Sequence, residues 1–211
     1  MRLRNVKNAM EILRGSSYFV ENAFDYKGKI LSLFSGSGPV HLEIGCGKGS
    51  FLIEMAKKYP NINFIGVEKY DSVLVRAIEK ANMEHISNLK FFCMDAKRLP
   101  EILIHDIEMI YLNFSDPWPK NRHHERRLTS STFLKIYDGL FVNDATIIQK
   151  TDNVILFASS LEDLSQNGYI LQKVSLNLHE TDIPNVMTEY EKRFSAMGQP
   201  IYYLEAKKNG K

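Results

Sequence analysis

Apolar residues along this chain follow two alternating patterns. Short continuous apolar runs, typical of buried strands, are followed by segments in which apolar residues recur every three or four positions, as on one face of a helix. Strands that alternate with helices in this way are typical of a parallel sheet with helices on both faces. The pattern therefore predicts an α/β protein.

The apolar runs predict seven strands: Val40–Ile44, Phe64–Val67, Leu89–Met94, Met109–Phe114, Ala145–Gln149, and two in the tail near Tyr169–Leu178 and Pro200–Leu204. Helical spacing predicts helices within residues 51–59, 73–81, 133–140 and 154–164, with Asp71 as the N-cap of the second. No helix separates the last two strands. The expected fold is therefore α/β, a doubly wound, mostly parallel seven-stranded sheet (Rossmann-like) with an antiparallel edge strand. The link 179–198 is longer than a hairpin needs and is a candidate functional segment.

Length and composition fit one domain spanning residues 1–211, with residues 1–30 as an N-terminal arm or helical extension. The basic start of this arm either contacts RNA phosphates or is a frayed terminus. The net charge is only +2, so any affinity for nucleic acid must come from a local patch. Cys46 and Cys93 are too few for a disulfide scaffold, which favours the cytoplasm. No apolar run is long enough to span a membrane, so no membrane association is expected.

A glycine-rich turn, G-C-G-K-G, follows the first predicted strand. Gly45, Gly47 and Gly49 allow a tight turn and let backbone N–H groups approach a ligand at the start of the next helix. The spacing differs from the G-x-G-x-x-G of dinucleotide-binding proteins, which disfavours a nicotinamide-dependent oxidoreductase.

Carboxylates stand at or near the ends of three successive strands: Glu43, Glu68 and Asp95. Each alone is more often a helix cap or a loop acid. Together they lie at the edge where open α/β sheets bind ligands, and they would meet an ammonium group, a ribose and an adenine in turn. The ligand that fits this arrangement is S-adenosyl-L-methionine.

The segment after the fourth strand, N-F-S-D-P-W-P-K-N-R-H-H-E-R-R-L, combines a carboxylate, a flat aromatic ring and positive charge. Two prolines stiffen the loop that carries Asp116 and Trp118. The ring of Trp118 either stacks on a base or packs beneath the loop. The basic cluster that follows either binds a polyanion or is a solvated face. Adjacent His123 and His124, without nearby Cys or acidic ligands, make a poor metal site, so no metal is expected.

Five segments, in this order, resemble the bacterial tRNA (guanine-N7)-methyltransferases, a family of class I S-adenosylmethionine-dependent methyltransferases. They are L-E-I-G-C-G-K-G-S-F, G-V-E, N-F-S-D-P-W-P-K with its basic continuation, Q-K-T-D-N and T-E-Y-E-K-R-F-S. The resemblance covers nearly the whole chain. It implies methylation of guanine N7 in tRNA, at position 46 of the variable loop, to give 7-methylguanosine. Asn121, Glu125 and Tyr203 depart from the basic residues common among relatives, which weakens the expected RNA-binding patch.

The resemblance also implies roles for individual residues. Asp116 would be the catalytic residue and would line the cofactor pocket together with Glu43, Glu68, Asp95 and the loop glycines. The target nucleotide would contact Lys120, Asp152, Thr188, Glu189, Tyr190 and Glu191. The RNA would lie along Arg122, His123, His124, Arg126 and Arg127. The partner would be tRNA, and the sequence leaves monomer and homodimer both open.

Guanine N7 is already nucleophilic at neutral pH, so the chemistry needs alignment more than a general base. Asp116 is therefore expected to clamp the guanine edge and stabilise the positive charge that develops on the ring. Asp152 either contacts that edge or caps the helix near Val154. Two rivals remain: a methyltransferase acting on another base or on a small molecule, which would not need the basic cluster, and a non-catalytic tRNA-binding subunit, which would not need Asp116.

Overall fold

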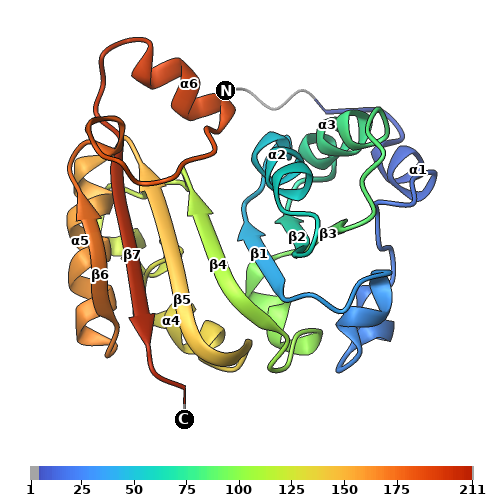
Figure 1. Ribbon diagram of the computed structural model, residues 1–211, viewed down its shortest axis with the longest axis horizontal. Helices are drawn as coiled ribbons and strands as arrows, with labels where there is room; N and C mark the ends of the chain where they lie inside the picture. Colours follow the sequence, from blue (N-terminus) through green and yellow to red (C-terminus); the bar gives the residue numbers. More distant parts are fainter. Residues whose placement is uncertain (1–4, 211) are drawn as a thin grey trace.

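The computed structural model describes residues 5–210 and has the seven-stranded, doubly wound α/β fold that the sequence predicts (Figure 1). Its strands are β1 Val40–Ile44, β2 Asn63–Glu68, β3 Leu89–Cys93, β4 Ile107–Asn113, β5 Phe141–Thr151, β6 Ile170–Ser175 and β7 Tyr202–Lys208. Its α-helices are α1 Ala9–Arg14, α2 Ser50–Lys58, α3 Asp71–Ala81, α4 Ser131–Asp138, α5 Val154–Gln166 and α6 Glu189–Ser195. Its 3₁₀ helices are Ala23–Tyr26, Ile30–Leu33, Ala96–Glu101, Asn121–Arg126 and Leu178–Glu180.

The strands form one sheet in the order β3-β2-β1-β4-β5-β7-β6. Strands β1 to β5 are parallel, whereas β7 runs antiparallel between β5 and β6. The predicted antiparallel strand is thus present, one position inside the edge. The winding direction reverses between β1 and β4, and such a switch point is where open α/β sheets place their ligands.

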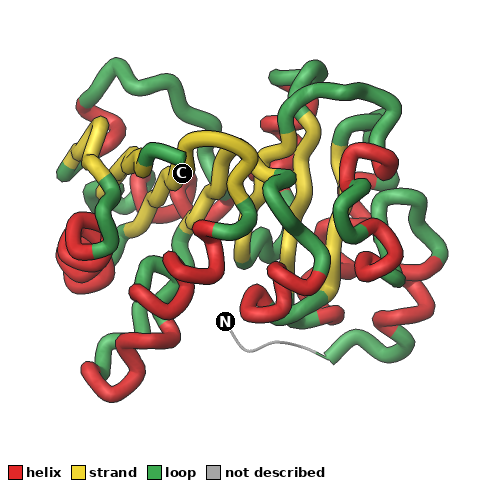
Figure 2. The backbone as a smooth tube through the Cα atoms, turned by 90° about the horizontal axis from the view of Figure 1, so that it is seen from below, coloured by secondary structure: helices red, strands yellow, loops and turns green. Residues whose placement is uncertain are grey.

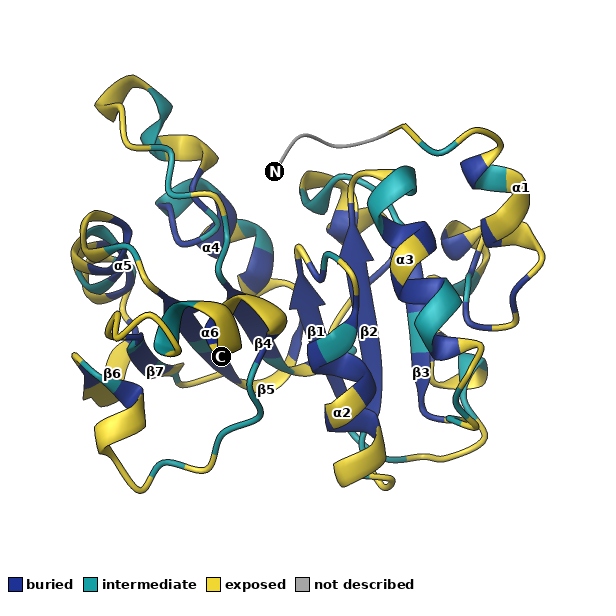
Figure 3. Ribbon diagram, turned by 90° about the horizontal axis from the view of Figure 1, so that it is seen from above, coloured by how far each residue is buried: buried dark blue, intermediate teal, exposed yellow. Residues whose placement is uncertain are grey.

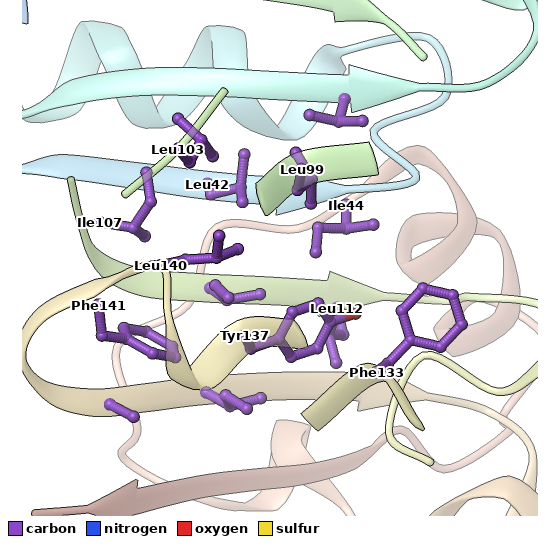
Figure 4. Close-up of a cluster of buried hydrophobic side chains, with 14 of the residues drawn as sticks. Leu42, Ile44, Leu99, Leu103, Ile107, Leu112, Phe133, Tyr137, Leu140 and Phe141 are labelled. Atoms are coloured by element: carbon purple, nitrogen blue, oxygen red, sulfur yellow. The ribbon is translucent and has the colours of Figure 1, made fainter. Parts of the chain in front are cut away.

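Helices cover both faces of the sheet, as the tube seen from below shows (Figure 2). Side chains of α1, α2 and α3 pack in one apolar cluster, and those of α4 and α5 contribute to the other. Figure 4 shows the second cluster, in which Leu42 of β1, Leu112 of β4 and Tyr137 of α4 contribute to one apolar layer. The central strands are buried between these layers, whereas the outer helix surfaces and most of the edge strand β6 are exposed (Figure 3). Burial on both faces explains why the central parallel strands appear in the sequence as continuous apolar runs.

Several local predictions differ from the structure. Tyr70 stands at the N-cap of α3 and Asp71 is the first residue of the helix, so the predicted position of the Asp71 cap is wrong, although Asp71 Oδ1 accepts from the Ser72 N–H. Asn153, not Asp152, caps α5 by accepting from the Leu156 N–H. Helix α6 was not predicted, because its residues E-Y-E-K-R-F-S carry no apolar stripe.

The N-terminal segment lies against the helical layer over α3. Ala9 and Leu13 of α1 are buried, and the Val6 N–H donates to Ser72 Oγ at 3.0 Å. The opening residues 1–4 of the predicted arm lie outside the described residues. Within the described part of the chain, no helix is both long and apolar enough to cross a membrane.

Candidate active site

Glu43 lies at the end of β1, beside the switch point. Its Oε1 accepts a hydrogen bond from Asn113 Nδ2 on neighbouring β4 at 2.8 Å. Its Oε2 is buried and has no hydrogen-bond partner among the described residues, and the same holds for Asn113 Oδ1 and Ser115 Oγ. Burial raises the pKa of Glu43 to about 7, although the bond from Asn113 and the charge of Lys150 oppose the rise. A buried carboxylate with one free oxygen favours a cationic ligand group.

The glycine loop wraps over the end of β2. The Gly47 N–H donates to Glu68 Oε2 at 3.1 Å, and the Tyr70 N–H donates to Oε1 of the same carboxylate at 3.0 Å. Gly45, Gly47 and Gly49 all have positive φ, and a Cβ on Gly49 would lie 2.7 Å from the Cβ of Ala77. All three positions therefore favour glycine for the backbone conformation, and Gly49 also needs it for close packing on α3.

Asp95 follows the end of β3. Its Oδ1 accepts from the Lys97 N–H at 3.0 Å, and its Oδ2 accepts from Lys69 Nζ at 2.8 Å. The hydrogen bond from Lys69 holds the pKa of Asp95 below its usual value, aided by the Lys97 N–H. The three acids thus lie at the ends of three adjacent parallel strands, as the sequence predicts, in an order that places Glu43 nearest the switch point.

Asp116 is exposed in a loop of unusual backbone geometry. Phe114 and Trp118, on either side of it, have φ of 51° and 40°, in the left-handed region that disfavours bulky side chains. Asp116, Pro117, Trp118 and Pro119 line an open hollow of about 280 Å³. The loop follows directly from β4, so Asp116 lies beyond the sheet edge on which Asn113 and Glu43 lie.

The side chain of Trp118 contacts the basic cluster. The guanidinium of Arg126 lies over its ring at 4.9 Å from the centroid, and His123 meets it edge-on at 5.7 Å. The two arginines at the end of the cluster differ sharply: Arg126 is exposed, whereas Arg127 is only 4% exposed and donates to backbone carbonyls. This placement contradicts the expectation that Arg127 lies along the RNA, because its charged group is turned inward.

The rest of the predicted RNA-facing group is at least partly accessible. Lys120 and Arg122 are exposed. His124 is half-buried, with Nε2 at 3.0 Å from Asp163 Oδ2. Asp152, which does not cap α5, is exposed and free to meet a substrate. Within residues 5–210, no cluster of three His, Cys, Asp or Glu side chains has the arrangement of a metal site.

Helix α6 begins with a capping box. Thr188 Oγ1 accepts from the Glu191 N–H, and Glu191 Oε2 accepts from the Thr188 N–H. Glu191 is fully buried, and it also pairs with Lys150 Nζ at 2.6 Å and accepts from Asn185 Nδ2. Glu191 has no exposed surface and each of its oxygens has two partners in the protein, since His179 Nε2 also lies 3.3 Å from Oε1, which argues against the predicted contact of Glu191 with the guanine edge. Glu191 instead anchors α6 on β5.

Glu189 connects α6 to the glycine loop. Its Oε1 accepts from Ser50 Oγ at 2.8 Å and from Lys80 Nζ, and its Oε2 lies 3.6 Å from Lys48 Nζ. Tyr190, the next residue, is exposed, and its ring lies between those of Phe114 and Phe194. Helix α6 therefore touches both the glycine loop and the loop of Asp116, over the carboxyl edge of the sheet (Figure 3).

Sequence reasoning missed Asn113 and Lys150 as parts of this site. Lys150 is buried, and that burial lowers its pKa although the charge of Glu191 opposes the shift. Both residues are polar and lie buried at or next to the carboxyl end of a strand, inside N-F-S-D-P-W-P-K and Q-K-T-D-N. Their position in the sequence could have identified them as parts of the site, because a polar side chain at a buried strand end needs a hydrogen-bond partner.

The doubly wound sheet, with a glycine loop after its first strand and acids at the next strand ends, defines a Rossmann-like methyltransferase. The fold is similar to that of an antibiotic-related methyltransferase (TM-score 0.65, 18% identity, 92% of this chain and 98% of that one). It is also similar to a SAM-dependent methyltransferase from Aquifex aeolicus (TM-score 0.58, 14% identity, 96% and 99%). A family model described as putative methyltransferase matches residues 37–204.

The sequence narrows this class to one family. The chain is 47% identical to the tRNA (guanine-N(7)-)-methyltransferase of Lachnoclostridium phytofermentans, over 98% of both chains. The chain therefore belongs to the tRNA (guanine-N7)-methyltransferase family.

Proposed function

We propose that this protein transfers a methyl group from S-adenosylmethionine to N7 of guanine in tRNA, at position 46 of the variable loop, to give 7-methylguanosine. The family gives the reaction and the class of substrate. The observation that carries the proposal is the free, buried Oε2 of Glu43 at the switch point of the sheet. We place the reaction in the cytoplasm, where tRNA is available.

The residues of the switch point fit the cofactor. Glu43 Oε2 would accept a hydrogen bond from its ammonium group, and Asn113 Oδ1 offers a second acceptor nearby. The glycine loop supplies backbone N–H groups, and Glu68 and Asp95 would meet ribose and adenine at the next two strand ends. S-adenosylmethionine, when bound, supplies a methyl group made electrophilic by its sulfonium sulfur.

The protein's own residues then have to position the base. Guanine N7 carries a lone pair in the ring plane, so no residue has to remove a proton before the attack. Asp116 would accept from the N1–H and the amino group of guanine, which fixes the ring plane. Its negative charge would stabilise the positive charge that the ring gains as N7 is methylated. Asp152, Lys120 and Tyr190 are all exposed, and their side chains would hold the nucleotide around Asp116.

The exposed basic residues account for binding of the RNA backbone. Lys120, Arg122 and Arg126 would neutralise phosphates, so the affinity for tRNA should fall as salt rises. A guanine buried in the folded tRNA must also be exposed before it can react, at a cost of a few kcal/mol.

The test is transfer of label from S-adenosylmethionine to tRNA that lacks 7-methylguanosine, followed by nucleoside analysis. We expect a 7-methylguanosine peak that is lost with Asp116→Asn and with a tRNA whose position 46 is adenine. Label in another nucleoside would indicate a different base. Cofactor binding without any labelled nucleoside would indicate a non-catalytic subunit or a substrate other than tRNA.

A further inference from the structure

The two ends of the Asp116 loop are held in different ways. At Phe114 the sheet itself fixes the backbone, because the Phe114 N–H donates to the Lys150 carbonyl at 2.8 Å. At Trp118 the chain has left the sheet, and its flanking residues Pro117 and Pro119 have no N–H to donate. A left-handed tryptophan between two prolines persists only where surrounding groups fix it.

The guanidinium of Arg127 fixes the backbone at Trp118. Arg127 Nε donates to the Pro117 carbonyl at 3.1 Å, and Nη2 donates to the Trp118 carbonyl at 3.2 Å. A single planar side chain thus bonds two consecutive carbonyls at the end of the loop. Only a guanidinium offers several N–H groups in a rigid plane, whereas the ammonium of a lysine is a point charge on a flexible stem.

Arg127 is itself anchored on a rigid helix. Its Nη1 donates to Ser159 Oγ on α5 at 2.6 Å, and Ser159 in turn donates to buried Asp163 at 3.2 Å. Its backbone N–H donates to the His124 carbonyl at 2.9 Å, which fixes the start of the side chain. The chain of contacts therefore runs from the core of α5, through Arg127, to the carbonyls next to Asp116.

The adjacent Arg126 has a different environment. Its guanidinium lies over the Trp118 ring and is open to solvent, so it can meet a phosphate without leaving the loop. The two consecutive arginines thus differ in burial. Arg127 faces the backbone of the loop, and Arg126 faces solvent.

We infer that Arg127 is a positioning residue that sets the backbone at Pro117 and Trp118, and through it the direction of the Asp116 carboxylate, and that it does not bind tRNA phosphates. The inference rests on the proposed role of Asp116 for its effect on methyl transfer. Its structural half, that Arg127 fixes the loop, does not depend on that role.

Trp118 is the only tryptophan of the chain, so tryptophan fluorescence, excited at wavelengths where the ten tyrosines do not absorb, reports on this loop alone. The test variant is Arg127→Lys, which keeps the charge but loses the planar fork. Arg76→Lys, at an exposed arginine that bonds Glu79 on α3, is the matched control. Arg126→Ala is the comparison for a residue that does bind RNA. Circular dichroism and a thermal melt establish that each variant is folded.

We expect Arg127→Lys to raise acrylamide quenching of Trp118 about twofold and to lower kcat at least tenfold. The dissociation constant for tRNA, and the slope of its logarithm against the logarithm of the salt concentration, should stay as in the parent protein in Arg127→Lys, and the slope should also stay unchanged in Arg127→Gln, which removes the charge. Arg126→Ala should instead weaken tRNA binding and reduce that slope by about one. Arg76→Lys should change none of these quantities.

A reduced salt slope in Arg127→Gln, with unchanged quenching in Arg127→Lys, would overturn the inference and return Arg127 to the RNA-binding group. Unchanged quenching and unchanged kcat would overturn it as well. If Arg127→Lys does not fold, Ser159→Ala removes the anchor of Nη1 while keeping the arginine, and it should raise quenching and lower kcat in the same direction. If the parent protein does not methylate tRNA, the proposed function fails, but the quenching comparison still decides whether Arg127 holds the loop.

Discussion

The raised pKa of Glu43 predicts that cofactor affinity depends on pH in a range where ordinary glutamates do not titrate. Burial places this pKa at about 7, against an ordinary value of 4.5. If the ionised carboxylate holds the ammonium group, affinity follows the ionised fraction, which is roughly a tenth at pH 6 and about half at pH 7. The dissociation constant should therefore fall roughly fivefold over this interval, or about 1 kcal/mol of binding free energy.

Isothermal titration calorimetry tests this prediction directly. Binding of a cation to Glu43 should lower its pKa and release a proton, about three quarters of a proton per site at pH 6.5. Titrations in two buffers with different ionisation enthalpies measure that number. In Glu43→Gln the affinity should be weaker, and both the pH dependence and the released proton that belong to Glu43 should disappear. Proton uptake, or the same pH dependence in the variant, would refute the assignment of the ammonium group to Glu43.

The same group predicts the pH dependence of stability without ligand. Because the folded-state pKa is raised, the native protein binds more protons than the unfolded chain between about pH 4.5 and 7. The contribution of Glu43 to the free energy of unfolding should therefore fall as pH rises through that window. Glu43→Gln should make the ligand-free protein less sensitive to pH, as measured by urea denaturation at pH 5 and pH 8.

Two further predictions concern the framework of the site. Gly49→Ala should destabilise the protein by about 1–3 kcal/mol, because its φ is +69° and the new Cβ would lie 2.7 Å from the Cβ of Ala77. Gly47→Ala, where φ is +56° but nothing lies within 4 Å of the new Cβ, should cost clearly less in urea denaturation, and equal losses would contradict the packing argument. Lys150→Met should cost about 3–5 kcal/mol in the same assay, because it leaves Glu191 buried without its ion-pair partner. A loss below about 1 kcal/mol would mean that Asn185, His179 and the Thr188 N–H satisfy Glu191 without Lys150.

Helix α6 connects the glycine loop to the loop of Asp116. Its Glu189 reaches Ser50 and Lys80 beside the glycine loop, and its Tyr190 packs on Phe114 beside Asp116. The buried pair of Glu191 with Lys150 holds the helix in that place. The long link that the sequence marks as a candidate functional segment thus connects the glycine loop with the loop of Asp116.

The sequence by itself determined the sheet and the edge on which the site lies. Apolar periodicity is a local property, so it predicted all seven strands, and residues that follow parallel strands must meet at one edge. The positions of Glu43, Glu68 and Asp95 follow from this rule. The motifs that resemble the family then predicted the reaction, because five short segments in one order are specific.

Only the tertiary structure decided which of the polar side chains are free to bind a ligand. Arg126 and Arg127 are identical and adjacent in the sequence, yet one is exposed and the other is bonded to the backbone next to Asp116. From the sequence alone, Glu191 is predicted to contact the substrate. The tertiary structure instead places Lys150, which is far away in the chain, beside Glu191 as its ion-pair partner. Whether a charged side chain binds a ligand or supports the fold depends on its neighbours in space, and burial and pairing at such distances leave no local pattern in the sequence.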